Sequence, residues 1–183
     1  TLQKAYRLAY TAMIHESRIK FLNREKIKPG KYVLYWMQQS QRSEYNHALE
    51  YTIDRANALG LPVVVLFVIA SYYPEANARH YTFMLDGIRA LRTELIDRGI
   101  SFIIRQGKPP EEVYNMSIDA AFLITDAGYT KIQKKWRADI AKKSSCQVMQ
   151  VESDAIVPVD IVSQKEEYSA GTFRPKIMRN LFE

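Results

Sequence analysis

The sequence predicts an α/β fold in which a doubly wound parallel sheet of five strands carries helices on both faces. Three observations support this prediction. Short apolar segments alternate with longer amphipathic ones from Lys31 onward. The apolar run over 62–69 lacks polar alternation, as expected of a strand that is buried on both faces. Glycine or proline stands between several of these segments, so the elements have defined ends.

A helical arm is expected to precede the sheet. Residues 2–22 show apolar side chains every three or four positions, at Leu2, Tyr6, Ala9, Tyr10 and Met13. This spacing predicts an amphipathic helix. Pro29 and Gly30 then end the arm and begin a new unit.

The elements of the sheet follow in order. The five predicted strands span residues 32–36, 62–69, 101–105, 120–125 and 147–151. Helical segments lie between them over 45–59 and 81–95, from Pro109 onward, and over 132–140. Gly60 is placed to cap the first helix, and Pro109 suits the first turn of the third. Strands and helices that alternate at this spacing indicate a Rossmann-like fold.

Three segments make up the predicted domain organisation. Residues 1–30 form the basic arm, residues 31–162 form the α/β domain, and residues 163–183 form a linker toward a further domain. The linker carries apolar residues spaced by about one helical turn, at Tyr168, Phe173, Ile177 and Leu181.

Composition and charge narrow the classes of function. The 183 residues carry a net charge of +6, and residues 1–31 hold eight basic and two acidic side chains. This arm is expected to be either a solvated helix face or a contact for nucleic acid. No apolar run approaches the length of a membrane span, and the basic first residues have no apolar core of a signal peptide. The single cysteine, Cys146, fits a cytoplasmic protein and is expected to be a small buried residue.

Polar residues gather where two predicted neighbouring strands end. In a doubly wound sheet, ligands bind beyond the carboxyl ends of the strands, at the point where the strand order reverses. The Met37–Arg42 loop and the Asp126–Thr130 loop flank that point and offer amides, a cation, a carboxylate and a phenol. Such groups suit a flat heteroaromatic or nucleotide-like ligand. The alternative is that they are ordinary solvated loop residues.

Several common enzyme signatures are missing. The sequence has no glycine-rich phosphate-binding motif and no G-x-S-x-G motif. His15, His47 and His80 have no ligand partners at metal-binding spacing, so no metal site is expected.

The segment from Trp36 to Asn46 resembles a motif of the photolyase/cryptochrome family. That motif usually reads W-H-R-x-D-L-R-x-x-D-N, and here it reads W-M-Q-Q-S-Q-R-S-E-Y-N. Trp36, Arg42 and Asn46 keep the pattern, whereas residues 37–40 depart from it in a way that is similar to class II cyclobutane pyrimidine dimer photolyases. Residues 78–95, 98–109 and 152–176 also resemble the family, in the same order.

The resemblance implies a supporting or antenna role for this domain. Photolyases hold FAD in a helical C-terminal domain, where light and reduced flavin split dimers in UV-damaged DNA. On this basis no catalytic residue is expected within this chain, and its partners are expected to be that domain and, through it, DNA. A deazaflavin antenna is the expected chromophore of this domain. Its candidate binding residues are Met37, Gln38, Arg42, Asp126 and Tyr129.

Two other functions fit the same fold. One is a stand-alone nucleotide-binding module of the universal-stress or electron-transfer-flavoprotein type. The other is an accessory module that binds nucleic acid through the basic arm.

Overall fold

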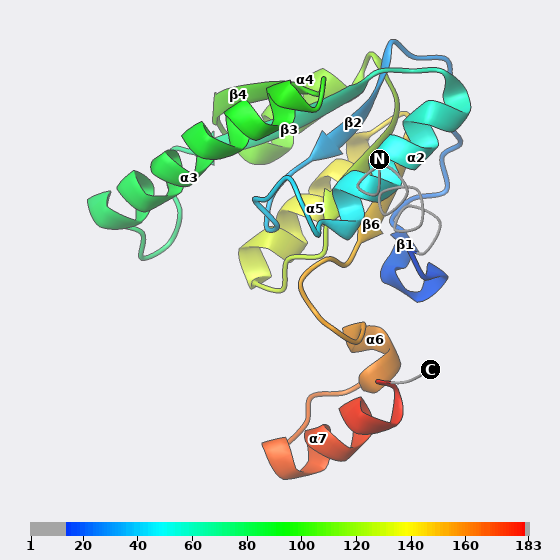
Figure 1. Ribbon diagram of the computed structural model, residues 1–183, viewed down its shortest axis with the longest axis vertical. Helices are drawn as coiled ribbons and strands as arrows, with labels where there is room; N and C mark the ends of the chain where they lie inside the picture. Colours follow the sequence, from blue (N-terminus) through cyan, green and yellow to red (C-terminus); the bar gives the residue numbers. More distant parts are fainter. Residues whose placement is uncertain (1–13, 182–183) are drawn as a thin grey trace.

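A mostly parallel sheet of six strands runs through the molecule (Figure 1). The computed structural model describes residues 14–181. The strand order is β1-β6-β5-β2-β3-β4. The strands are β1 (Ile19–Phe21), β2 (Tyr32–Trp36), β3 (Val63–Ala70), β4 (Ser101–Gly107), β5 (Ala120–Asp126) and β6 (Gln147–Val151). Strands β2 to β6 are parallel, and β1 joins β6 antiparallel.

Helices cover both faces of this sheet. They are α2 (His47–Leu59), α3 (Ala78–Asp97), α4 (Pro109–Ser117) and α5 (Lys131–Lys143). The core on one face includes residues of α2 and α3, and the core on the other face includes residues of α4 and α5. The chain passes from β2 to β3 and β4, then crosses back to β5 and β6 on the other side of β2. The predicted doubly wound α/β fold is therefore confirmed.

Alternation along the strands produces the two cores. Val33 and Tyr35 of β2 face α2 and α3, whereas Leu34 and Trp36 face α4 and α5. All four side chains are at most 1% exposed. Because neighbouring side chains on a strand point to opposite faces, a strand covered on both sides must be apolar throughout. This requirement explains the uninterrupted apolar segments of the sequence.

Local signals set the ends of the helices as predicted. Gly60 ends α2 with a φ of 65°, a left-handed conformation that glycine adopts without strain. Pro109 is the first residue of α4. Gly30 has a different role, because a Cβ there would lie 2.2 Å from the backbone nitrogen of Ala121. The chain can therefore pass β5 at this point only with glycine.

The N-terminal arm differs from the prediction. Residues 14–22 are not helical as expected, because they form the short 3-10 helix η1 (Glu16–Arg18) and strand β1. Ile19–Phe21 pair with residues 149–151 of β6, so this edge depends on a partner distant in the sequence. The apolar positions from Leu2 to Met13 lie outside the described residues. The basic arm as a nucleic-acid contact stays a prediction.

Two short helices follow the sheet. They are α6 (Val159–Val162) and α7 (Ala170–Arg179), and Figure 1 shows them beyond the sheet and its covering helices. Glu167 joins the segment between them to α7 by accepting a hydrogen bond from Lys176 Nζ at 2.5 Å. The predicted boundaries after residues 30 and 162 stay predictions.

Candidate functional site

The candidate site lies at the carboxyl edge of the sheet. Strands β2 and β5 are neighbours, although β3 and β4 come between them in the chain. The strand order therefore reverses between β2 and β5, and the loops after them meet at this edge. These are the two loops in which the sequence predicts a ligand site.

Asp126 organises the loop that follows β2. Its side chain is buried, and Oδ2 accepts the backbone N–H groups of Gln38, Gln39 and Ser40 at 2.8, 2.7 and 3.0 Å. Oδ1 accepts the hydroxyl of Tyr35 at 2.6 Å. Burial raises the pKa of Asp126 above its usual range, and the four donors act in the opposite direction. The carboxylate is therefore engaged within the protein and does not line the pocket described below.

Arg42 and Tyr129 hold the segment after β6. The Arg42 guanidinium donates to Asp154 Oδ1 and to the Ser153 carbonyl, both at 2.9 Å. The Tyr129 hydroxyl donates to the Glu152 carboxylate. Burial, together with this carboxylate, raises the pKa of Tyr129 well above its usual value. Neither side chain lines the pocket, so the structure assigns both to loop anchoring.

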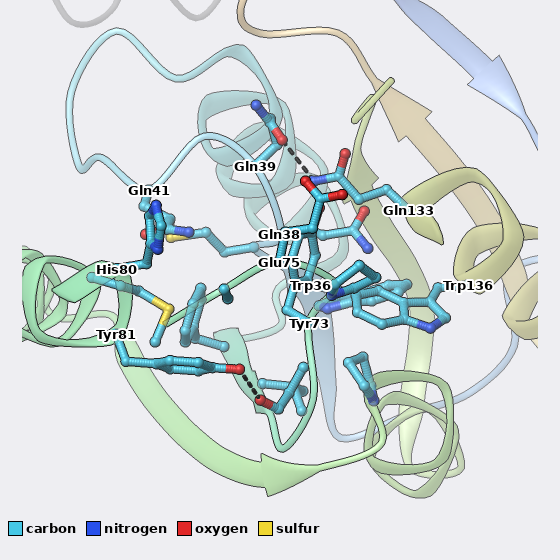
Figure 2. A pocket seen from close by; sticks show the side chains of 18 residues that line it. Trp36, Gln38, Gln39, Gln41, Tyr73, Glu75, His80, Tyr81, Gln133 and Trp136 are labelled. Carbon is cyan, nitrogen blue, oxygen red and sulfur yellow. Dashed lines mark hydrogen bonds between the residues drawn. The ribbon is translucent and has the colours of Figure 1, made fainter. Parts of the chain in front are cut away.

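A pocket of about 600 Å³ opens beside the loop after β2 (Figure 2). Met37 and Gln38, two of the predicted binding residues, line it. Its other walls come from β3 and the loop after it, the start of α3, the first residue of α4 and the first turns of α5. The polar part of its lining consists of Gln38, Gln39, Gln41, Glu75, His80 and Gln133.

Aromatic side chains form much of the remaining wall. The rings of Tyr73 and Trp136 meet edge to face, with centroids 6.1 Å apart and an interplanar angle of 70°. In Figure 2 they lie on one side of the pocket, while Gln41 and His80 lie on the opposite side. The hydroxyl of Tyr81 donates to the Ala70 carbonyl at 3.0 Å. Flat apolar surfaces of this kind suit a planar ring system.

Hydrogen bonds engage several amide atoms of the pocket, and one buried amide nitrogen lacks a partner. Gln133 Nε2 donates to Gln39 Oε1 at 2.7 Å, and Gln133 Oε1 accepts from Thr130. Gln38 Oε1 accepts from Arg137 Nη1 at 3.4 Å, whereas Gln38 Nε2 is buried without a hydrogen-bond partner. Burial lowers the pKa of Arg137. A buried donor without a partner is costly unless a ligand or water accepts from it.

The residues that β3, α3 and α5 contribute to the pocket were not predicted from the sequence. The prediction relied on the two polar loops after β2 and β5. The pair Tyr72-Tyr73 at the end of β3 was the available signal, because aromatic residues at a strand end favour ring binding. Trp136 packs against the core on one face of the sheet and also lines the pocket.

Other kinds of site find no support in residues 14–181. This part of the chain has no cluster of three or more histidine, cysteine or acidic side chains that could hold a metal ion. It also has no helix that is long and apolar enough to cross a membrane.

Comparison with known proteins identifies relatives along most of the chain. The family model described as DNA photolyase matches residues 33–183. A deoxyribodipyrimidine photo-lyase from Methanothermobacter thermautotrophicus is 48% identical over 170 residues, which are 92% of this chain and 38% of that protein. Another from Arabidopsis thaliana is 31% identical over 182 residues, which are 95% of this chain and 37% of that protein. The chain therefore spans less than two fifths of these relatives' length.

Solved structures share the fold. A photolyase from Sulfolobus tokodaii, solved with two FAD molecules, aligns with a TM-score of 0.69 at 16% identity, over 80% of this chain and 34% of that one. A putative universal stress protein from Pseudomonas aeruginosa aligns with a TM-score of 0.51 at 14% identity, over 71% and 51%. At these identities the structures show the fold alone, so the family rests on the sequence matches. By these matches, the chain belongs to the DNA photolyase family.

Proposed function

We propose that this chain is the N-terminal α/β domain of a deoxyribodipyrimidine photolyase and that its pocket holds an antenna chromophore. The 48% identity to a protein of that name supports the enzyme class. The repair reaction would take place in the flavin domain that the family resemblance places after this one. Splitting of pyrimidine dimers in UV-damaged DNA, driven by light, is the chemistry that bound reduced FAD supplies there.

The pocket carries the antenna part of the proposal. Its volume of about 600 Å³ falls in the range of small-molecule sites, and its walls combine aromatic rings with a few oriented amides. The buried Gln38 Nε2 lacks an acceptor, which the carbonyl of a flavin-like ring would provide. The residues present therefore fit a planar heteroaromatic chromophore.

The chromophore of this proposal is a deazaflavin, and the enzyme is of class II. Both assignments rest on the resemblance, in which Met37, Gln38, Gln39 and Ser40 replace the usual family residues. Met37 and Gln38 would contact the chromophore directly. Arg42, Asp126 and Tyr129 would act indirectly, since each holds a loop or segment next to the pocket. A cytoplasmic location is part of the same proposal.

A repair assay tests the enzyme class. The protein to test carries this domain together with the flavin domain, and the readout is the loss of thymine dimers from DNA in blue light and in darkness. Loss in the light alone is the expected result. If light gives no more repair than darkness, the repair assignment is wrong and a light-sensing role becomes the better interpretation.

A reconstitution experiment tests the antenna role. Added deazaflavin should raise the rate of repair at wavelengths where deazaflavin absorbs and reduced flavin does not. Trp136→Ala removes one aromatic wall and should abolish this gain, while the rate under direct excitation of the flavin should stay the same. Ile118→Ala is a matched control, because Ile118 is exposed and does not line the pocket.

A further inference from the structure

The pocket has an unusual charge for a site at the edge of a Rossmann-like sheet. Among its lining residues none is lysine or arginine, and Glu75 supplies a carboxylate. Two basic side chains near the pocket already interact with other protein groups. Arg137 donates to Gln38 and lies near the opposite charge of Asp126, and Lys108 pairs with Glu111 at 3.1 Å. The lining therefore offers no cation to an anionic ligand.

The amide groups that often bind phosphate in this fold are also occupied. Phosphate usually binds where successive backbone N–H groups converge after the first strand. Here the N–H groups of Gln38, Gln39 and Ser40 converge on Asp126 Oδ2. The protein's own carboxylate fills the place that a phosphate oxygen would take.

The helix starts beside the pocket also have several of their backbone N–H groups occupied or missing. In α3 the Asn77 side chain accepts the N–H groups of Arg79 and His80, and His80 Nδ1 accepts that of Asn77. In α5 the side chains of Thr130 and Gln133 cap each other's backbone N–H groups. Helix α4 begins with two prolines, which have no N–H to donate. At each of these three starts a side-chain cap or a proline removes some of the N–H groups that a ligand could use.

Glu75 occupies a distinctive place in the pocket wall. It has a φ of 63°, which is uncommon for a residue other than glycine, and it lies in the loop between β3 and α3. Figure 2 shows its side chain among the pocket residues, with the carboxylate drawn on the side where Gln39 meets Gln133. A negative charge here repels an anionic ligand, and the surrounding amides do not neutralise it.

We infer that this pocket selects an uncharged, phosphate-free ring ligand and that Glu75 is a residue that determines this specificity. The inference rests on the proposed antenna function and narrows its ligand class. A dinucleotide such as FAD should therefore bind this pocket poorly. Its two phosphates would meet Glu75 without any compensating cation in the lining.

The test compares riboflavin with riboflavin 5′-phosphate, because the two probes share one ring and differ by the phosphate. Each is titrated into the purified chain, and ring fluorescence reports binding. The wild-type chain should bind riboflavin 5′-phosphate about tenfold more weakly than riboflavin. This difference is expected of one uncompensated charge repulsion near the surface. Raising the salt concentration should reduce this difference.

Variants of Glu75 assign the effect to one residue. Glu75→Gln should reduce the difference between the two probes, and Glu75→Lys should reverse the preference. Glu166→Gln removes an exposed carboxylate outside the pocket and should leave the ratio unchanged.

Each outcome has a separate meaning. If the wild-type chain binds riboflavin 5′-phosphate as tightly as riboflavin or more tightly, the selection against anions is wrong. The pocket would still be a binding site for a planar ring. An unchanged ratio in Glu75→Gln would overturn the role of Glu75. If neither probe binds to a chain whose circular dichroism shows it to be folded, the antenna pocket itself is wrong, and this inference with it.

Discussion

Replacing Asp126 by alanine should strongly destabilise this domain. The change removes the acceptor of four hydrogen bonds, three from the backbone N–H groups of Gln38, Gln39 and Ser40 and one from the hydroxyl of Tyr35. A buried donor left without a partner costs about 1–3 kcal/mol. At the lower limit for each of the four donors, the free energy of unfolding should fall by about 4 kcal/mol.

Asparagine at position 126 is the matched comparison. It keeps the shape and one acceptor oxygen, and the Tyr35 hydroxyl can still donate to Asn46 Oδ1, which lies 3.4 Å away. Asp126→Asn replaces hydrogen bonds to a charged group by weaker neutral ones, so a loss of about 2 kcal/mol is expected. Glu44→Ala, at an exposed position in the same loop, should change stability by less than about 0.5 kcal/mol.

Urea denaturation followed by circular dichroism measures these differences. Hydrogen exchange gives a second readout, because the amides of Gln38, Gln39 and Ser40 should lose protection in Asp126→Ala before the rest of the sheet does. A loss of less than about 1 kcal/mol in Asp126→Ala would refute the reasoning. It would mean that water or a shifted loop satisfies the four donors.

Two further predictions concern the backbone and pH. Gly30→Ala should destabilise the domain by several kcal/mol, because the new Cβ would lie 2.2 Å from the backbone of Ala121, whereas Gly87→Ala in open space on α3 should be neutral or stabilising. Thermal melts of the two variants compare these effects, and equal melting temperatures would contradict the steric argument. Hydrogen bonds from Lys176 and Ser163 lower the pKa of Glu167 to about 2. Because this folded value lies below the usual 4.5, the contact stabilises α7 above pH 4.5 and is lost as the pH falls toward 2. An NMR titration of the Glu167 carboxyl group should therefore show a midpoint well below 4.5, and a midpoint at 4.5 would argue against the contact.

Much of the fold was predictable because its signals are local. The apolar run that became β3, Gly60 at the end of α2 and Pro109 at the start of α4 each act within a few residues of chain. Hydrophobic periodicity and helix capping depend on neighbours in the sequence, so they can be interpreted without a structure. Strand β1 was missed because its three residues become a strand through pairing with β6, which lies more than a hundred residues away.

The site was predictable in position but not in detail. The sequence determined an α/β domain and predicted a ligand site between β2 and β5, where Met37 and Gln38 line a pocket. The tertiary structure turned Asp126 inward onto the loop amides and brought Tyr73 and Trp136 together across the pocket. The physical reason is that a polar side chain pairs with whichever donors folding places within about 3 Å of it. A sequence shows which groups are available, and only the packed structure decides which of them are left for a ligand.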